Sequence, residues 1–159
     1  MEVQSIQLKN FDLRKVDLDN KEHLNFLKEL FQHNGDSSMD FLGDLSNVQD
    51  GNAYIVKSAD VGVIGYFSMS IPVVNKLGLR TCGIYYAIDS KYRNKGYATK
   101  LLQEVSLYLF EELDMLVLSI DKDNMASRRV AEKNLFHVIF EDEDDVLMAK
   151  YAKVNTKVL

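Results

Sequence analysis

The stretch 92–102 constrains the fold of this chain more than any other. It follows an apolar run, residues 83–88, that predicts a strand. Beyond the stretch, apolar residues recur at helical spacing and predict a helix over 96–112 with one apolar face: Ala98, Leu101, Leu102, Val105 and Leu109. The sequence therefore predicts the order strand, basic glycine-containing loop, helix.

This loop has the chemistry of an anion-binding site. The first N–H groups of a helix have no partner within the helix, and the helix dipole favours a negative charge beside them. Gly96 carries no Cβ, so a phosphate can come close to the backbone there. Arg93 and Lys95 add positive charge. We therefore expect a phosphate group at the start of the helix.

Two common phosphate loops do not fit these residues. The P-loop needs a second glycine followed by Lys and Ser or Thr, and the dinucleotide fingerprint needs three glycines, whereas Gly96 stands alone. The remaining pattern is Arg-x-x-Gly-x-Ala, formed by Arg93, Gly96 and Ala98. The alternative interpretation is an ordinary surface loop whose basic residues serve solubility.

The pattern resembles the pyrophosphate-binding motif of the GNAT acyltransferase superfamily, whose members bind acyl-coenzyme A. A second stretch, residues 124–136, follows the apolar run 115–120 and resembles the later GNAT motif, in which an Asn opens a short helix. Its form, Asn-x-x-Ser-x-x-Val-Ala-Glu-Lys, is most similar to the branch that acetylates ribosomal-protein N-termini and related amines. Two motifs in the correct order, each after a strand, are more specific than either alone.

The resemblance implies one acyltransferase domain over residues 1–159. Its fold would be of the α/β (α+β) class: a mixed, mostly antiparallel sheet of six to seven strands with helices on both faces. The sheet would be split between its fourth and fifth strands, with acyl-CoA in the split. Apolar patterning predicts strands at 5–13, 53–57, 61–69, 79–88, 115–120, 136–140 and 146–151, and helices after Asp19 or Asn20 and at 38–45, 96–112 and 125–133.

The same resemblance implies acetyl-CoA as the co-substrate. The residues expected to bind it lie on the strand before the loop, on the loop, and at the start of the later helix: Tyr86, Ile88, Arg93, Asn94, Lys95, Gly96, Tyr97, Ala98, Thr99, Asn124, Ser127 and Arg128. In the family, the Asn at position 124 hydrogen-bonds the pantetheine arm. Asn124 is equally suited to cap the helix, and both roles can hold together.

The chain departs from the family pattern at two positions. Many members carry a Tyr seven residues after the Asn, as the acid for the leaving thiolate, but this chain has Ala131 there. Ser127 is the nearest hydroxyl on the helix face of Asn124, so we expect it to donate a hydrogen bond to the sulfur instead. Leu135 stands where the pattern usually has Gly. Asn134 tolerates the left-handed conformation, so we expect it to end the helix one residue early.

A neutral primary amine would attack the thioester carbonyl directly. The backbone N–H near Ile88 is the expected donor to the developing oxyanion. No residue stands out as the base: Tyr85 and Tyr86 are candidates by location, although strand alternation sends them to opposite faces. Deprotonation through water would leave no signature in the sequence.

Composition limits the partners. The chain has 159 residues, a net charge of −5 and no basic stripe, which does not favour nucleic acid but tolerates a cationic amine. No apolar run reaches the ~18 residues of a membrane span, and the first residues lack a signal-peptide pattern. Cys82 is the only cysteine, which fits a cytoplasmic protein. An amine-bearing small molecule or a peptide N-terminus is the expected partner, with association into a homodimer left open.

A metal site is not expected. The three histidines, His23, His33 and His137, are scattered, and no cysteine or carboxylate cluster stands at ligand spacing. The acidic run 141–145 lacks the glycine and the terminal Glu of a calcium loop, so it predicts an acidic turn between the last strands.

Three classes of function remain open. The first is an acyl-CoA-dependent N-acetyltransferase. The second is a GNAT-like module that binds acyl-CoA without catalysis, as Ala131 permits. The third is an unrelated phosphate-binding α/β domain. Acetyl-CoA turnover with a panel of amines separates the first two, and failure to bind CoA would favour the third. The loops expected to select the acceptor, such as 32–40 and 72–78, carry no recognisable motif.

Overall fold

The structure, a computed structural model, describes residues 5–33 and 45–153. Its elements follow one another in the order β1 (Ser5–Gln7), β2 (Phe11–Lys15), α1 (Lys21–His33), α3 (Leu45–Gln49), β3 (Ala53–Ser58), β4 (Gly62–Met69), β5 (Val73–Val74), β6 (Arg80–Ile88), η1 (Ser90–Tyr92), α4 (Tyr97–Leu109), β7 (Met115–Asp121), α5 (Met125–Lys133), β8 (His137–Glu141) and β9 (Asp145–Tyr151). The helix expected over 38–45 lies outside the described residues except for Leu45, where α3 begins.

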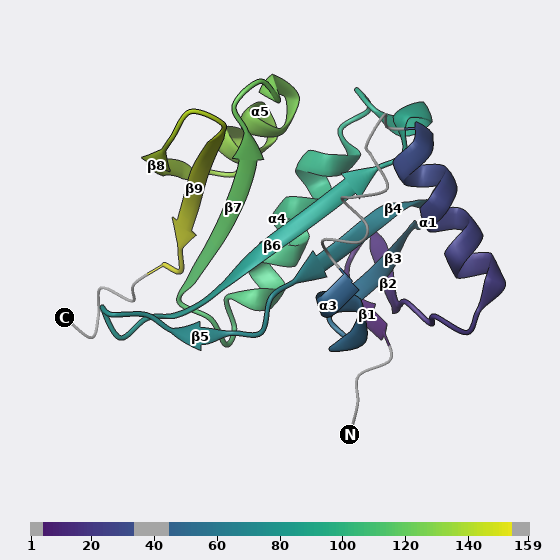
Figure 1. The fold of residues 1–159 in the computed structure, drawn as a ribbon, viewed down its shortest axis with the longest axis horizontal. Helices are drawn as coiled ribbons and strands as arrows, with labels where there is room; N and C mark the ends of the chain where they lie inside the picture. The colour runs from purple at the N-terminus through teal and green to yellow at the C-terminus, as the bar shows by residue number, and fades with distance from the viewer. Residues whose placement is uncertain (1–4, 34–44, 154–159) are drawn as a thin grey trace.

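The described strands form one sheet in the order β1-β2-β3-β4-β6-β7-β9-β8, and β5 pairs with β6 at the side (Figure 1). The pairings between the described strands are antiparallel except that of β6 with β7. The mixed, mostly antiparallel sheet is therefore confirmed. It has two more strands than expected, because a turn at 8–10 divides the predicted first strand into β1 and β2, and because β5 adds a two-residue strand.

The two parallel strands pair over only part of their length. The register joins Thr81–Gly83 of β6 to Met115–Val117 of β7, and β6 then continues to Ile88 without pairing to β7. Figure 1 shows the two strands diverging toward the start of α5. The predicted split between the fourth and fifth expected strands thus lies between β6 and β7.

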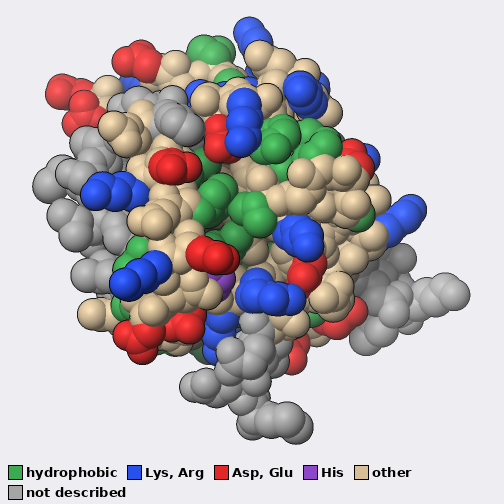
Figure 2. Space-filling view, turned by 90° about the vertical axis from the view of Figure 1, so that its right-hand side faces the viewer, with side chains coloured by type: hydrophobic (Ala, Val, Ile, Leu, Met, Phe, Trp, Pro, Cys, Tyr) green, Lys and Arg blue, Asp and Glu red, His purple; other side chains and the backbone are tan. Residues whose placement is uncertain are grey.

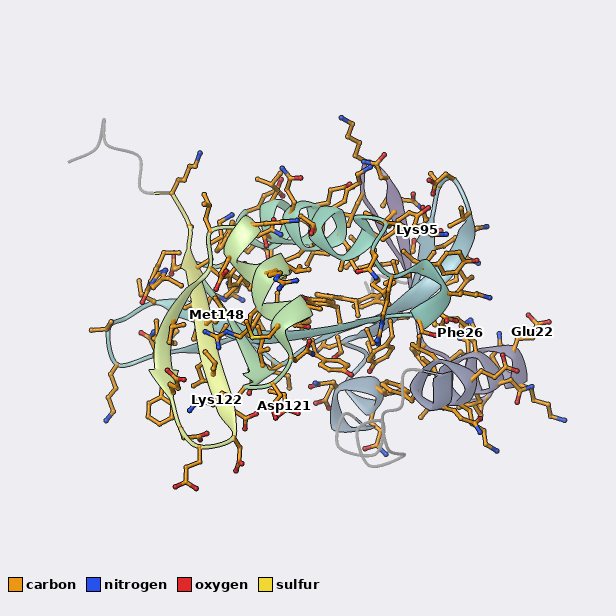
Figure 3. All side chains as sticks on the ribbon, turned by 90° about the horizontal axis from the view of Figure 1, so that it is seen from above. Glu22, Phe26, Lys95, Asp121, Lys122 and Met148 are labelled. Carbon is orange, nitrogen blue, oxygen red and sulfur yellow. The ribbon has the colours of Figure 1, made fainter. Side chains whose placement is uncertain are left out.

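Helices cover both faces of the sheet. One apolar cluster lies between the sheet and helices α4 and α5, and a second lies between the sheet and helices α1 and α3 (Figure 3). Tyr86 packs against the first cluster and Tyr85 against the second, as strand alternation requires. The face of α4 predicted from the sequence is buried through Leu101, Leu102, Val105 and Leu109.

Gly65 of β4 permits the close approach of β6. A Cβ built at this position would overlap the backbone carbonyl oxygen of Ala87, and backbone cannot move aside as a flexible side chain can. The residue pairs with Ile88, the last residue of β6. A glycine is therefore required where β6 ends and the loop toward α4 begins.

Candidate functional site

The end of β6 directs alternate backbone groups into the split. The N–H of Ser70 donates to the carbonyl of Gly83 (2.9 Å), and the N–H of Asp89 donates to the carbonyl of Ile64 (2.8 Å). Since hydrogen bonding to one neighbour alternates along an antiparallel strand, these odd-numbered residues bond toward β4. The backbone N–H groups of Tyr86 and Ile88 are therefore directed to the opposite side, toward β7.

The loop after β6 turns the chain toward α4 through two left-handed residues. Asp89 caps the short helix η1 by accepting a hydrogen bond from the N–H of Lys91 (3.2 Å). Asn94 has a φ of 62° and Gly96 a φ of 84°. Asparagine and glycine are the residues that adopt this conformation at least cost, which explains their presence here.

The start of α4 fits a phosphate group. Gly96 is the N-cap residue and has no side chain that could accept a hydrogen bond from the first N–H groups of the helix. Apart from Gly96 and its two chain neighbours, no atom of the described residues lies within 4 Å of the position that a Cβ on Gly96 would occupy, so the backbone is open to a ligand. The N–H groups of Tyr97, Ala98 and Thr99, the first three residues of α4, have no acceptor within the helix itself, and an anion could accept their hydrogen bonds.

Basic and aromatic side chains surround this helix start. Arg93 and Lys95 belong to the loop itself, and Lys95 is labelled in Figure 3. The ammonium groups of Lys91 and Lys95 lie 5.3 Å and 6.0 Å from the centroid of the Tyr92 ring, and Tyr92 meets Tyr97 edge to face at 6.1 Å. On the face shown in Figure 2, acidic and basic side chains are interspersed.

Asn124 caps α5 on the other side of the split. Its side-chain oxygen accepts a hydrogen bond from the N–H of Ser127 (3.1 Å). The capping role expected of Asn124 is confirmed. Arg129 is exposed, as expected, whereas Ser127 and Arg128 are half-buried.

Two hydroxyl groups meet where α5 faces β6. The hydroxyl oxygen of Tyr86 is buried and has no hydrogen-bond partner among the described residues. Burial raises the pKa of Tyr86 to about 12, and the neighbouring Ser127 hydroxyl lowers it by a smaller amount. The two hydroxyls are thus close, although they do not form a hydrogen bond of good geometry. The Nε of Arg128 is likewise buried without a partner in the described part of the chain.

The expected end of α5 is wrong in one detail. Asn134 has a φ of −94°, and it is Leu135 that adopts the left-handed conformation, with a φ of 67°. Asn134 instead donates its side-chain amide to the carbonyls of Thr99 (3.1 Å) and Val130 (3.0 Å). These bonds tie α5 to α4 and hold Asn134 in a right-handed conformation, so the turn falls one residue later, at the position where the family pattern has Gly.

Two residues considered from the sequence lie in the core. Ala131 is fully buried, so the position of the usual tyrosine contributes packing in this chain. Cys82 is 2% exposed, and burial raises the pKa of its thiol to about 11. Neither side chain reaches the surface of the split.

Of the two loops expected to select the acceptor, the loop 32–40 lies outside the described residues except for residues 32 and 33. The loop 72–78 surrounds β5 and leads to the start of β6, roughly 26 Å along the strand from Ile88. In residues 5–33 and 45–153, no cluster of His, Cys, Asp and Glu could hold a metal ion. No helix in these ranges is both long enough and apolar enough for a membrane span.

The sequence matches the family model of the acetyltransferase (GNAT) domain over residues 16–137. The chain belongs to the GNAT acetyltransferase family. This membership confirms the prediction of an acyl-CoA-dependent N-acetyltransferase with acetyl-CoA as its co-substrate. No curated protein sequence matches this GNAT protein.

Solved structures share the fold at low sequence identity. A GNAT-family acetyltransferase from Bacillus anthracis is 18% identical with a TM-score of 0.69, over 93% of this chain and 98% of that one. The ribosomal-protein-S5-alanine acetyltransferase from Vibrio fischeri is 16% identical with a TM-score of 0.66, over 96% of this chain and 98% of that one. The N-acetyltransferase PseH from Campylobacter jejuni, solved with acetyl coenzyme A, is 19% identical with a TM-score of 0.65, over 92% of this chain and 99% of that one.

Sequence reasoning missed one contact beside the loop that leads into α4 of this GNAT protein. The hydroxyl of Tyr97 donates to the carboxylate of Asp60 (3.1 Å), a residue in the turn between β3 and β4. The side chain of Tyr97 thus joins the helix start to this turn, while its expected role in binding acetyl-CoA stays a prediction. Asp60 precedes Tyr97 by 37 residues, so no local pattern could have linked them.

Proposed function

We propose that this GNAT protein transfers the acetyl group of acetyl-CoA to a primary amine by direct attack in a ternary complex. The observation that carries the proposal is the divergence of β6 from β7 after the short parallel pairing of Thr81–Gly83 with Met115–Val117, with the open start of α4 beside it. The junction offers backbone N–H groups to a bound thioester, and the helix start offers them to a pyrophosphate. Both donor sets belong to continuous secondary structure, so they are in place before acetyl-CoA binds.

Each part of acetyl-CoA then has its partners. The pyrophosphate binds the backbone from Gly96 to Thr99, with Arg93, Asn94 and Lys95 beside it. The pantetheine arm lies against β6 and the start of α5, where Asn124 and Arg128 face it. The buried Nε of Arg128, which has no partner among the described residues, supports this placement because a buried donor without an acceptor is costly.

The chemical step requires little of the protein beyond positioning. The amine nitrogen attacks the carbonyl carbon, the carbon–sulfur bond breaks, and its electron pair leaves with the sulfur. Backbone N–H groups near Ile88 donate to the carbonyl oxygen, and the hydroxyl of Ser127 donates to the sulfur. The proton lost by the amine passes to water, since no side chain of the site stands out as its base. Holding the amine against the thioester supplies a large part of the rate acceleration.

The acceptor is a primary amine of a small molecule or of a protein N-terminus. Solved structures of similar fold include a spermidine N-acetyltransferase chimera and an acetyltransferase of the ribosomal L7/L12 N-terminus. The net charge of −5 is compatible with a cationic acceptor of either kind. A non-catalytic acyl-CoA-binding module is the second candidate, favoured by Ala131 at the usual tyrosine position.

Two measurements on the purified protein separate these candidates. Calorimetry with CoA tests binding, and release of CoA thiol tests turnover with polyamines, amino-sugars and short peptides with free N-termini. Binding together with amine-dependent turnover supports the enzyme, and binding with no turnover above acetyl-CoA hydrolysis supports the module. Absence of CoA binding would overturn both. N-terminally blocked peptides serve as the matched control.

A further inference from the structure

The proposed function leaves the Tyr86 hydroxyl, which lies in the split, without a role. It comes from β6, and the hydroxyl beside it, that of Ser127, comes from the first turn of α5. The two groups therefore belong to the two elements that border the split, 41 residues apart in the chain. The Tyr86 hydroxyl oxygen is buried without a hydrogen-bond partner among the described residues.

A buried tyrosine hydroxyl without a partner requires an explanation. Folded proteins satisfy most buried polar groups, and tyrosine in particular usually places its hydroxyl where a partner is available. A phenylalanine at position 86 would fill the same space without this cost. The hydroxyl is therefore best explained by a group that arrives with a ligand.

We propose that Tyr86 is a catalytic residue that donates a hydrogen bond, together with Ser127, to the sulfur of CoA. This inference rests on the proposed function, because it assumes that the thioester lies in the split. The leaving sulfur would then have two hydrogen-bond donors, Tyr86 from β6 and Ser127 from α5, where many family members have one tyrosine on the helix. Ala131, at that helix position, is fully buried and has no hydroxyl.

No other tyrosine near the split fits this role. Tyr85 points to the opposite face of the sheet, where it packs against the cluster under α1 and α3. Tyr97 already donates its hydroxyl to Asp60. Tyr92 lies on η1, beyond the end of β6, and its ring is near the ammonium groups of Lys91 and Lys95. Of these four tyrosines, Tyr86 is the one whose described surroundings include the Ser127 hydroxyl.

The acidity of the two groups decides what Tyr86 can do. With its pKa raised to about 12, the hydroxyl stays protonated at neutral pH and can donate. An ordinary thiol has a pKa of about 8.5, so the phenol is the weaker acid by roughly three orders of magnitude. Tyr86 therefore keeps its proton and stabilises the thiolate by hydrogen bonding. The carbon–sulfur electron pair stays on sulfur, and the thiolate takes its proton from water after release.

This role predicts a pH-dependent affinity for free CoA. A donor to the thiolate lowers the pKa of the bound thiol below its value in water, so CoA binds more tightly as the pH rises through that range. Titration calorimetry from pH 6.5 to 9.5 should show this rise in the parent protein. In Tyr86→Phe the affinity at pH 9.5 should be roughly tenfold lower than in the parent, with little difference at pH 6.5.

Three controls define the contribution of the hydroxyl. Desulfo-CoA lacks the sulfur, so its affinity should be equal in the parent and in Tyr86→Phe at every pH. Tyr85→Phe removes the same hydroxyl from the opposite face and should keep the pH dependence of the parent. Ser127→Ala should lose part of the pH dependence of CoA affinity. The double variant of Tyr86→Phe and Ser127→Ala should lose less than the sum of the two single losses, because both hydroxyls serve the same sulfur atom.

Turnover and stability provide independent measurements. Tyr86→Phe should lower kcat with little change in KM for acetyl-CoA, since the charge on sulfur develops in the transition state. The CoA-free variant should melt no lower than the parent, because it loses only an unsatisfied hydroxyl. A clearly lower melting temperature would mean that Tyr86 serves the fold, and would overturn the proposal.

The outcomes distinguish this inference from the proposed function. If the parent protein does not bind CoA, the proposed function fails and this inference fails with it. If the parent binds CoA but Tyr86→Phe shows the same pH dependence, the role of Tyr86 is disproved while the acetyltransferase proposal stands. An equal loss of desulfo-CoA binding would also disprove it, because the hydroxyl would then serve the pantetheine arm.

Discussion

The hydroxyl of Tyr97 donates a hydrogen bond of 3.1 Å to the carboxylate of Asp60. Tyr97 is the first residue of α4, and Asp60 lies in the turn between β3 and β4, where it also accepts a hydrogen bond from the Ser58 hydroxyl. This contact joins the start of α4 to a hairpin on the same side of the sheet. It fixes the helix end whose N–H groups we propose to bind the pyrophosphate.

Tyr97→Phe should therefore weaken CoA binding without altering the fold. The contact is exposed, so we expect only a severalfold loss of affinity by titration calorimetry. Asp60→Asn should give a similar loss. Tyr108→Phe, the same change near the other end of α4, is the control and should bind CoA as the parent does. Equal affinities for all of these proteins would show that the contact does not position the loop.

The same contact gives a pH expectation. The hydrogen bond from Ser58 is the largest cause that holds the pKa of Asp60 below its usual value, and the one from Tyr97 adds to it. A carboxyl group with a lowered pKa stabilises the folded state above its unfolded pKa of about 3.9, and this stabilisation is lost as the pH falls through the lower folded value. Between pH 5 and 9 the contribution of the Tyr97–Asp60 hydrogen bond to the free energy of unfolding should therefore be unchanged.

Gly96→Asp should lower CoA affinity roughly ten- to a hundredfold. The new side chain places a Cβ and a negative charge at the open start of α4, against a bound phosphate. Gly78→Asp is a close control, because Gly78 has a similar φ, 79° against 84°, and equally open surroundings. Both variants bear the cost of a left-handed aspartate, so a comparable loss in Gly78→Asp, or none in Gly96→Asp, would place the phosphates elsewhere.

Cys82 should be unreactive in the folded protein. Burial raises the pKa of its thiol to about 11, so the thiolate is present at only about one part in a thousand at pH 8. Iodoacetamide should label Cys82 only after denaturation, and Cys82→Ala should retain turnover within severalfold of the parent. An acetylated Cys82 in intact-mass spectra of the protein mixed with acetyl-CoA would contradict this prediction and indicate a covalent intermediate.

Leu135→Gly should stabilise the protein. Leu135 has a φ of 67° and is 73% exposed, so it bears the strain of a left-handed backbone while burying little. Relief of about 1–2 kcal/mol of strain, reduced by the greater freedom of glycine in the unfolded chain, leaves a gain of about 0.5–1 kcal/mol. The melting temperature should rise by roughly 1–4 °C. Leu77→Gly removes another exposed leucine, without positive φ, and should give no gain.

Local sequence determined most elements of this protein and the position of the loop between β6 and α4. The apolar periodicity of 83–88 and 96–112 predicted β6 and α4, because burial of one face is recorded in the spacing of residues. Asn124 was predicted to cap α5, and Gly96 to lie at the start of α4, because capping and left-handed turns each favour particular residues over a few positions.

Tertiary structure alone decided which residues meet at the site. Tyr86 faces Ser127 only because β6 and β7 diverge after three paired residues, and Tyr97 reaches Asp60 only because a hairpin 37 residues earlier lies beside α4. The side chain of Asn134, held by the carbonyls of Thr99 and Val130, moved the left-handed turn to Leu135. Contacts between distant segments depend on strand register and helix packing, so the spacing of residues along the chain does not predict them.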